Sequence, residues 1–212
     1  YPKLQVSVPF TPVTGRRILL RPEHDEPRVR RATIAAMAEI AGRLGVSSLH
    51  VTFPTGAEAE AFRAAGWLIR EGLQYHWDNA GFANFDAFLA ALSHSKRKAI
   101  RKERREVAGQ GLELERLTGP ALRPEHWEHF FDFYIATSEH KWGRPYLNLD
   151  FFQRLGATMP DRVLLVMAKK SGRYVGGALN LIGADTLYGR NWGCRGEFKH
   201  LHFETCYYQA IE

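Results

Sequence analysis

The stretch "RVLLVMAKKSGRYVGGALNLIGADTLYGRNWG", residues 162–193, determines the fold of the second half of the chain. It contains three segments with the apolar and β-branched composition of strands: "RVLLVMAKK", "RYVGGALNLIG" and "TLYGRNWG". The connections "SG" and "GAD" between them are short and are typical of tight turns. The stretch therefore predicts a three-stranded antiparallel meander.

Helical patterns flank this meander. "PEHWEHFFDFYIATSEHKWG" (124–143) predicts an aromatic-rich helix that runs into a loop, and "LDFFQRLGATM" (149–159) predicts a second helix. "LELERL" (112–117) before them reads as a strand. After the meander, a basic loop leads into a final helix around His202.

Residues 84–107 predict an amphipathic helix with a strongly basic outer side. Asn84 is a suitable N-cap, and Ser93 or Ser95 is expected to divide the helix into two. The apolar stripe is formed by Phe85, Phe88, Leu89, Leu92, Ala99, Ile100 and Val107. The other side carries six cations: Arg97, Lys98, Arg101, Lys102, Arg104 and Arg105. This side is either a solvated face or a surface that contacts phosphates.

The first 80 residues predict a β-α-β-α-β order. The expected strands are "KLQVSVPF" (3–10), continued by "GRRILL" (15–20), then "SSLHVTF" (47–53) and "WLIREGLQYHW" (67–77). The expected helices cover residues 26–44 and 56–66. The seam "DNAGFAN" (78–84) separates this block from the rest of the chain.

Composition indicates a folded globular protein. The chain has 212 residues, of which 45% are hydrophobic and 12% aromatic, and no apolar run reaches the roughly 18–20 residues of a spanning helix. The net charge is +6, and residues 95–107 alone carry seven Lys or Arg against two Glu, so the basic character is local. The two cysteines form no CxxC pair, which favours a reducing compartment, the cytoplasm. The start at Tyr1 and the helical end predict a fragment of a longer chain.

Two parts of the sequence resemble the GNAT acyltransferase fold. "EAFRAAGWLIREGLQYHW" (60–77) resembles the motif that closes a GNAT unit, and the element order of the second half resembles the way such a unit begins. Along nearly the whole chain the sequence resembles the bacterial FemAB-like family, the predicted N-acyltransferases of peptidoglycan biosynthesis or recognition. That resemblance rests on "PKLQVSVPFTPVTG", "HWDNAGFANFDAFLAAL", "KRKAIRKERREVAGQGL", "KWGRPYLNLDFF" and "LYGRNWGCRGEFKHLHFETCYYQAIE".

This resemblance implies an α/β (α+β) fold of tandem GNAT-like units, with mixed, mostly antiparallel sheets flanked by helices. Residues 1–80 would be the C-terminal half of a first unit and residues 81–212 the N-terminal part of a second. It also implies transfer of an acyl or aminoacyl group to an amine, as on a peptidoglycan precursor. The donor would be acyl-CoA or aminoacyl-tRNA, bound as a substrate with no tightly held cofactor.

Two loops are candidates for binding the phosphates of the donor. We favour "GRNWGCRGEFKH" (189–200), which lies between a predicted strand and a helix start, over "VPFTPVTGRR" (8–17). The donor-binding candidates are Arg190, Gly193, Arg195, Lys199 and His202. Neither loop has the Q/R-x-x-G-x-G/A pattern of acetyl-CoA enzymes, and a basic surface loop without a ligand is the alternative interpretation.

Three side chains near this loop are candidates for proton transfer. Glu204 would accept a proton, and Tyr188 or Tyr207 would return one to the leaving group. Each of them alone is more often structural, since a buried tyrosine usually only satisfies its hydroxyl. Residues 139–146, "EHKWGRPY", resemble a substrate-binding loop of the family, in which Lys141, Trp142 and Arg144 would hold an anionic acceptor.

No metal site is expected. His200, His202 and Glu204 share one side only on a strand, whereas a helix is predicted there. His126 and His129 lack a third ligand and are expected at the surface, and Cys206 is expected to be a packed thiol.

Two further functions remain open. One is a non-catalytic module that recognises peptidoglycan precursors. The other is binding of tRNA or another nucleic acid through four cations of the basic helix: Arg97, Arg101, Lys102 and Arg105.

Overall fold

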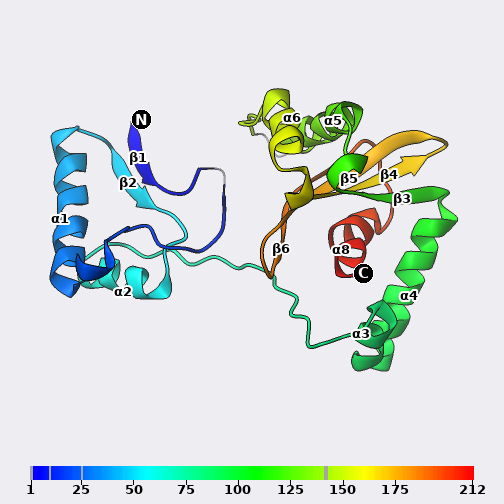
Figure 1. Cartoon of the computed structure of the whole chain (residues 1–212), viewed down its shortest axis with the longest axis horizontal. Coiled ribbons are helices and arrows are strands. Elements are labelled where there is room, and N and C mark those ends of the chain that lie inside the picture. The colour runs from blue at the N-terminus through cyan, green and yellow to red at the C-terminus, as the bar shows by residue number, and fades with distance from the viewer. Residues whose placement is uncertain (1, 10, 25, 141–142) are drawn as a thin grey trace. The chain divides into compact units, whose positions relative to one another are not determined.

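The computed structural model describes residues 2–9, 11–24, 26–140 and 143–212. The chain forms two compact units, Tyr1–Trp77 and Asp78–Glu212, both drawn in Figure 1. Unit 2 begins at the first residue of the predicted seam.

Unit 1 is a parallel βαβ arrangement followed by one more helix. Its elements are β1 (Lys3–Val6), η1 (Pro22–His24), α1 (Pro27–Arg43), β2 (Ser48–Val51) and α2 (Gly56–Ala64). β1 and β2 pair in parallel, with Lys3 opposite Ser48, because α1 returns the chain to the same end of the sheet. Its buried core consists of Ile18, Ile34 and Phe62.

Two predicted strands are not formed in unit 1. Residues 15–20 and 67–77 contain no strand in the structure, and the sheet is parallel where a mixed, mostly antiparallel sheet was expected. The side-chain amide of Gln74 donates to the backbone oxygen of Pro12 at 2.8 Å. Gln74 therefore lies beside Pro12, which has no backbone N–H to donate in a β-sheet. The β-rich composition of residues 67–77 produces an extended chain without a partner strand.

Unit 2 contains the predicted meander and the helices around it. Its helices before the meander are α3 (Phe85–Ala91), α4 (His94–Gly109), η2 (Gly119–Ala121), α5 (Pro124–His140), α6 (Leu149–Thr158) and η3 (Pro160–Arg162). Its strands are β3 (Leu112–Leu117), β4 (Val163–Lys170), β5 (Arg173–Ile182) and β6 (Leu187–Cys194). The last helical elements are α7 (Leu201–Phe203), η4 (Glu204–Tyr208) and α8 (Gln209–Ile211).

The four strands form one antiparallel sheet in the order β3-β4-β5-β6. This confirms the meander and the mixed α/β fold class. Ser171 and Gly172 connect β4 to β5 with φ angles of 50° and 75°, as expected for a two-residue hairpin turn that matches the strand twist.

Helices cover both faces of this sheet. α5 and α6 lie on one face, and α4 and α8 lie on the other (Figure 1). The core on the α5 face includes Trp127, Phe130, Phe133, Phe152, Leu165 and Met167. The core on the opposite face, which we call the η4 face, consists of Val107, Leu112, Ala168 and Leu201. Side chains of the strands therefore alternate between two apolar layers.

Side-chain caps divide the predicted amphipathic helix as expected. The side chain of Asn84 accepts a hydrogen bond from the N–H of Ala87 at 2.9 Å, and α3 begins there. The hydroxyl of Ser93 accepts from the N–H of Lys96 at 3.5 Å, and α4 begins there. Short polar side chains at these positions satisfy N–H groups that have no partner within the helix.

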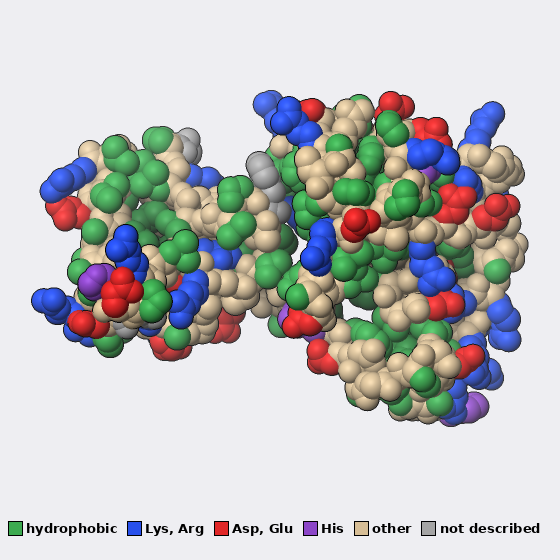
Figure 2. Space-filling model, viewed as in Figure 1, with side chains coloured by type: hydrophobic (Ala, Val, Ile, Leu, Met, Phe, Trp, Pro, Cys, Tyr) green, Lys and Arg blue, Asp and Glu red, His purple; other side chains and the backbone are tan. Residues whose placement is uncertain are grey.

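The basic side of α4 matches the prediction except at Arg97 and Arg104. Arg97 is only partly exposed and donates to the backbone oxygen of Ala90 at 3.1 Å. Four cations on it are exposed: Lys98, Arg101, Lys102 and Arg105. Arg104 is only partly exposed, because helical spacing places it between Ile100 and Val107, and it donates to Glu204. Figure 2 shows Lys and Arg side chains along the edge of unit 2 where Figure 1 labels α4.

Candidate active site

β6 contains a β-bulge where it pairs with β5. Leu179 of β5 lies opposite Asn191, whereas the next residue, Asn180, lies opposite Gly189. Arg190 is therefore the extra residue of the bulge, between the two registered residues Gly189 and Asn191. Such a bulge places two consecutive side chains on one side of a sheet.

The faces of β6 follow from its contacts. A Cβ atom on Gly193 would lie 2.1 Å from the backbone oxygen of Phe133 in α5, so Gly193 faces α5. Trp192 packs into the core on the η4 face. Asn191 consequently lies on the α5 face by alternation. The guanidinium of Arg190 reaches the same face, because its Nη2 donates to the hydroxyl of Tyr146 at 2.7 Å.

Tyr146 belongs to the segment that was predicted to bind substrate. The hydroxyl of Tyr134 in α5 accepts hydrogen bonds from the N–H groups of Tyr146, at 3.1 Å, and of Leu147, at 3.2 Å. These contacts fix the segment against α5. Arg144 is exposed, and the two other residues predicted for this segment, Lys141 and Trp142, lie outside the described residues.

Tyr188 lies on the same face of the sheet, close in sequence to the bulge. It lies opposite Leu181, whose side chain packs against the core on the α5 face, and 37% of Tyr188 is exposed. The group formed by Tyr146, Tyr188, Arg190 and Asn191 is called the bulge cluster below. It joins Arg190, predicted for donor binding, to the predicted substrate segment.

The other cations of the predicted donor loop are paired with carboxylates. Arg195 makes two hydrogen bonds to Asp132 of α5, at 3.0 and 2.7 Å, and this contact lowers the pKa of Asp132. Lys199 lies 2.8 Å and His200 lies 3.3 Å from the carboxylate of Glu106 in α4. The hydrogen bond from Lys199 is the main cause of the lowered pKa of Glu106. The loop is therefore less electropositive than its sequence indicates.

Gly193 is a packing residue in this structure. Its Cα lies against the backbone of Phe133 and the hydroxyl of Thr137, and that hydroxyl donates to the backbone oxygen of Trp192 at 2.9 Å. The absence of a side chain lets β6 approach α5, which leaves no room for a ligand at this position. Close packing of helix and strand explains this glycine better than the predicted contact with a donor.

Glu204 and Tyr207 lie on the helix beyond the sheet and do not share the α5 face with Tyr188. Glu204 is 4% exposed, and both of its carboxylate oxygens accept hydrogen bonds from Arg104, at 3.1 to 3.2 Å. Tyr207 is 39% exposed and contacts the ring of His202, which also contacts Trp192. The structure thus separates the predicted catalytic residues, and it favours a structural role for Glu204.

The final helix starts at Leu201, and η4 within it is a π-helical segment. Burial raises the pKa of the Cys206 thiol to about 12, so it is a packed thiol as expected. Among the described residues, no group of His, Cys, Asp or Glu is arranged to hold a metal ion.

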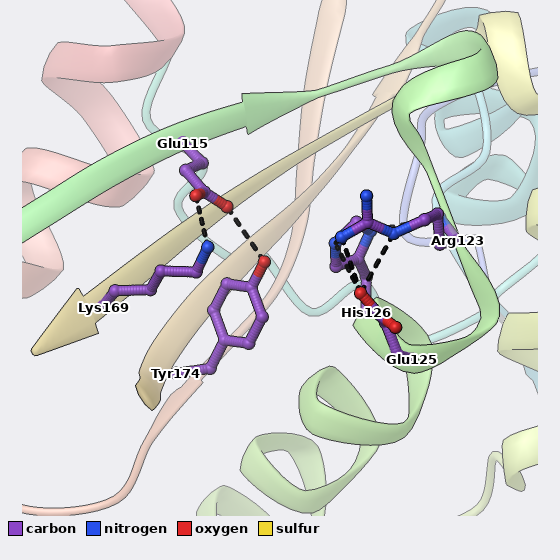
Figure 3. Close-up of polar contacts among 6 residues, drawn as sticks. All are labelled: Glu115, Arg123, Glu125, His126, Lys169 and Tyr174. Atoms are coloured by element: carbon purple, nitrogen blue, oxygen red, sulfur yellow. Dashed lines mark hydrogen bonds and ion pairs between the residues drawn. The ribbon is translucent and has the colours of Figure 1, made fainter. Parts of the chain in front are cut away.

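Sequence reasoning did not identify a second polar cluster, at the start of α5 (Figure 3). Glu115 of β3 forms an ion pair with Lys169 of β4 and accepts a hydrogen bond from the hydroxyl of Tyr174 in β5 at 2.9 Å. Burial opposes ionisation of Glu115, but these two hydrogen bonds hold its pKa below the usual value. The partners are up to 59 residues apart, so no local pattern could reveal them.

His126 is buried, which corrects the prediction that it lies at the surface. It is 1% exposed, and its Nδ1 accepts a hydrogen bond from the N–H of Arg123 at 3.1 Å. This bond satisfies a backbone group just before α5 and resembles half of a capping box. The pKa of His126 is lowered, first by burial and then by the charge of Arg123.

We expect His126 to make stability depend on pH. Below about pH 6.5, unfolded chains protonate this imidazole while the folded chain resists, so stability should fall as pH decreases from 6.5 towards the lowered pKa. The slope for one proton is at most about 1.4 kcal/mol per pH unit. His126→Gln keeps an acceptor without a titrating group, and its urea-unfolding free energy should be flatter over this range. Equal slopes in both proteins would contradict the assignment. Glu115 and Glu125 near His126 are present in both proteins, so they contribute equally to the two slopes.

The fold and the bulge cluster define a mixed α/β protein with a polar site at the end of an antiparallel sheet. The family model described as "Peptidoglycan biosynthesis/recognition" (FemAB-like) matches residues 1–212. The chain therefore belongs to the FemAB-like family, as its sequence predicted.

Comparison with solved structures adds a distant match. An aminoglycoside acetyltransferase from an uncultured soil metagenomic sample has 16% sequence identity and a TM-score of 0.27. The match covers 47% of this chain and 66% of that enzyme, slightly under two thirds of its length. No curated protein matches the chain. Within the described residues, every helix is too short or too polar to cross a membrane.

Proposed function

We propose that this chain belongs to an N-acyltransferase that transfers an acyl or aminoacyl group to an amine of a peptidoglycan precursor. The family match supports a role in peptidoglycan biosynthesis or recognition. The observation that carries the proposal of transfer is the bulge cluster, in which Arg190 is hydrogen-bonded to Tyr146 beside Tyr188. Because both donor classes are made in the cytoplasm, we place the activity in the bacterial cytoplasm.

In this reaction a neutral amine attacks the acyl carbonyl carbon. A C–N bond forms, the bond from that carbon to the sulfur of a CoA thioester or the oxygen of a tRNA ester breaks, and one amine proton passes to the released thiol or hydroxyl. A fixed guanidinium at Arg190 disfavours the ammonium form of a nearby amine. The hydroxyl of Tyr146, which accepts from Arg190, is a group of the kind that stabilises an oxyanion by donating a hydrogen bond. Tyr188 is a second hydroxyl donor on the same face.

The donor's phosphates are proposed to bind at residues 195–200. Arg195 and Lys199 are exposed there, and a phosphate would exchange with the carboxylates that now pair with them. Acyl-CoA and aminoacyl-tRNA both meet this requirement, since each joins phosphates to an activated carbonyl.

The direct test is a mass-spectrometric assay with both donors and an acetylated, lysine-containing precursor peptide. We expect Arg190→Ala to lower kcat/KM by about 10- to 100-fold, because a hydrogen bond from a charged group contributes about 1.5–3 kcal/mol. Arg173→Ala, at an exposed position at the start of β5, is the matched control and should retain activity. Transfer that is unaffected by Arg190→Ala would exclude the bulge cluster. Peptide binding without transfer from either donor would identify the non-catalytic recognition module instead.

A second proposal is that α4 contacts tRNA when aminoacyl-tRNA is the donor. The supporting observation is the exposed basic side of α4. There Arg101 lies 3.3 Å from the exposed Asp86, and the exposed Lys102 lies 3.6 Å from the half-buried Glu106. Exposed pairs of this kind stabilise folded proteins only weakly, so these cations are dispensable for folding.

Reversing the charge of Arg101, Lys102 and Arg105 should therefore leave the urea-unfolding free energy within about 0.5 kcal/mol of wild type. If α4 contacts tRNA, the slope of log K against log salt should decrease by roughly one unit per lost phosphate contact. An unchanged slope in filter-binding measurements would leave α4 as a solvated face.

A further inference from the structure

One buried side-chain oxygen in the bulge cluster lacks a hydrogen bond. Among the described residues, the Oδ1 atom of Asn191 is buried and no donor reaches it. An unsatisfied buried acceptor destabilises a fold, and native proteins retain few of them. Its location beside Arg190, the extra residue of the bulge, places this oxygen in the proposed site.

Asn180 on the adjacent strand provides an internal comparison. It is 2% exposed, and its Nδ2 donates to the backbone oxygen of Leu164 at 3.2 Å. Leu179 packs in the core of the α5 face, so alternation places Asn180 on the η4 face. Two neighbouring strands thus carry one asparagine that bonds within the fold and one whose acceptor is unused.

We propose that Oδ1 of Asn191 accepts a hydrogen bond from an N–H of the acyl-accepting amine, and that it selects amine over hydroxyl acceptors. This inference rests on the proposed transferase function. An amide oxygen can orient an N–H but cannot take up a proton. A neutral amine is nucleophilic before it loses a proton, whereas a hydroxyl needs a general base.

The adjacent Arg190 supports the same choice. The bulge places Arg190 and Asn191 on one face, so an amine bound to Asn191 lies near a fixed positive charge. That charge favours the neutral, reactive form of the amine. A carboxylate at this position would instead stabilise the unreactive ammonium. Asn191 can therefore accept a hydrogen bond from the amine without adding a negative charge that would stabilise the ammonium form.

Two probe peptides test this assignment. One is an Nα-acetylated tripeptide with a single lysine, and the other has norleucine in its place, which removes only the amine. In ¹⁵N NMR spectra of the whole chain, the side-chain amide signal of Asn191 should shift with the lysine peptide and stay unchanged with the norleucine peptide. The signal of Asn180 should not respond to either one.

Asn191→Leu and Asn180→Leu provide matched variants of similar volume. Asn191→Leu removes an unsatisfied group, so its urea midpoint should equal or exceed that of wild type, while its affinity for the lysine peptide falls about tenfold. Asn180→Leu should lower the urea midpoint, because it removes a satisfied hydrogen bond.

Each other result contradicts the assignment. A clear loss of stability in Asn191→Leu would show that the oxygen has a structural partner. Lysine-peptide binding that leaves the Asn191 signal unchanged would overturn this inference and leave the proposed function intact. Failure of the peptide both to bind and to be acylated would overturn the inference and the proposed function together.

Discussion

Replacing Arg104 with Met should destabilise unit 2 by about 3–5 kcal/mol. The Arg104 guanidinium makes three hydrogen bonds to the buried carboxylate of Glu204 and one of 2.7 Å to Glu212. It also lies 4.7 Å from the centre of the Phe85 ring. Methionine fills much of the same space but removes the positive charge. Among the described residues, the side-chain amide of Gln209 is then the remaining side-chain donor to the buried carboxylate. An uncompensated buried charge is the costly outcome.

The double variant Arg104→Met/Glu204→Leu is the control for this prediction. Removing both charges leaves no unpaired ion, so most of the lost stability should return. Hydrogen exchange of the β4 amides in increasing urea would report the unfolding free energy of unit 2 alone. A single variant as stable as wild type would show that Glu204 is not held by this pair. Such a result would restore Glu204 as a free proton acceptor.

Gly193→Ala should be at least as damaging, at about 3 kcal/mol or more. The added Cβ would lie 2.1 Å from the backbone oxygen and 2.5 Å from the backbone carbon of Phe133. Neither atom can move without shifting α5 against the sheet, which places this substitution above the usual range of about 1–3 kcal/mol for overpacking. Hydrogen exchange should show the loss in β6 and α5 first.

Gly189→Ala on the same strand is the matched control. The nearest atom to a Cβ there is Oδ1 of Asn180 at 3.6 Å, an ordinary contact. Its stability should stay within about 0.5 kcal/mol of wild type, since only the usual strand preference changes. Similar losses in both variants would mean that the glycines act through chain flexibility and not through the contact with α5.

Features set by neighbouring residues could be predicted from the sequence. The Ser171–Gly172 turn, the caps at Asn84 and Ser93, and the start of the last helix all depend on a few adjacent residues. The antiparallel meander follows from such turns. The strand expected at residues 67–77 failed because strand formation needs a partner, and sequence composition does not identify one.

The candidate site was only partly predictable for the same reason. Arg190 and Tyr188 could be singled out by residue type, but the contact between Arg190 and Tyr146 joins residues 44 apart. The pairing of Arg195 with Asp132, 63 residues apart, changed the expected charge of the donor loop. The burial of Glu204 likewise depends on Arg104, 100 residues earlier. The bulge itself is a property of register between two strands, which no single segment encodes.

The extra residue in β6 also bears on how this site can vary among related proteins. Without Arg190, Gly189 and Asn191 would be consecutive, and they already lie on opposite faces opposite Asn180 and Leu179. Loss of that one residue would therefore leave every other side chain of the strand on its present face and both apolar layers undisturbed. Deletion of this one residue in a related protein would leave the packing of the core unchanged but would remove the guanidinium. Position 190 can thus change through insertion or deletion independently of the sheet that carries it.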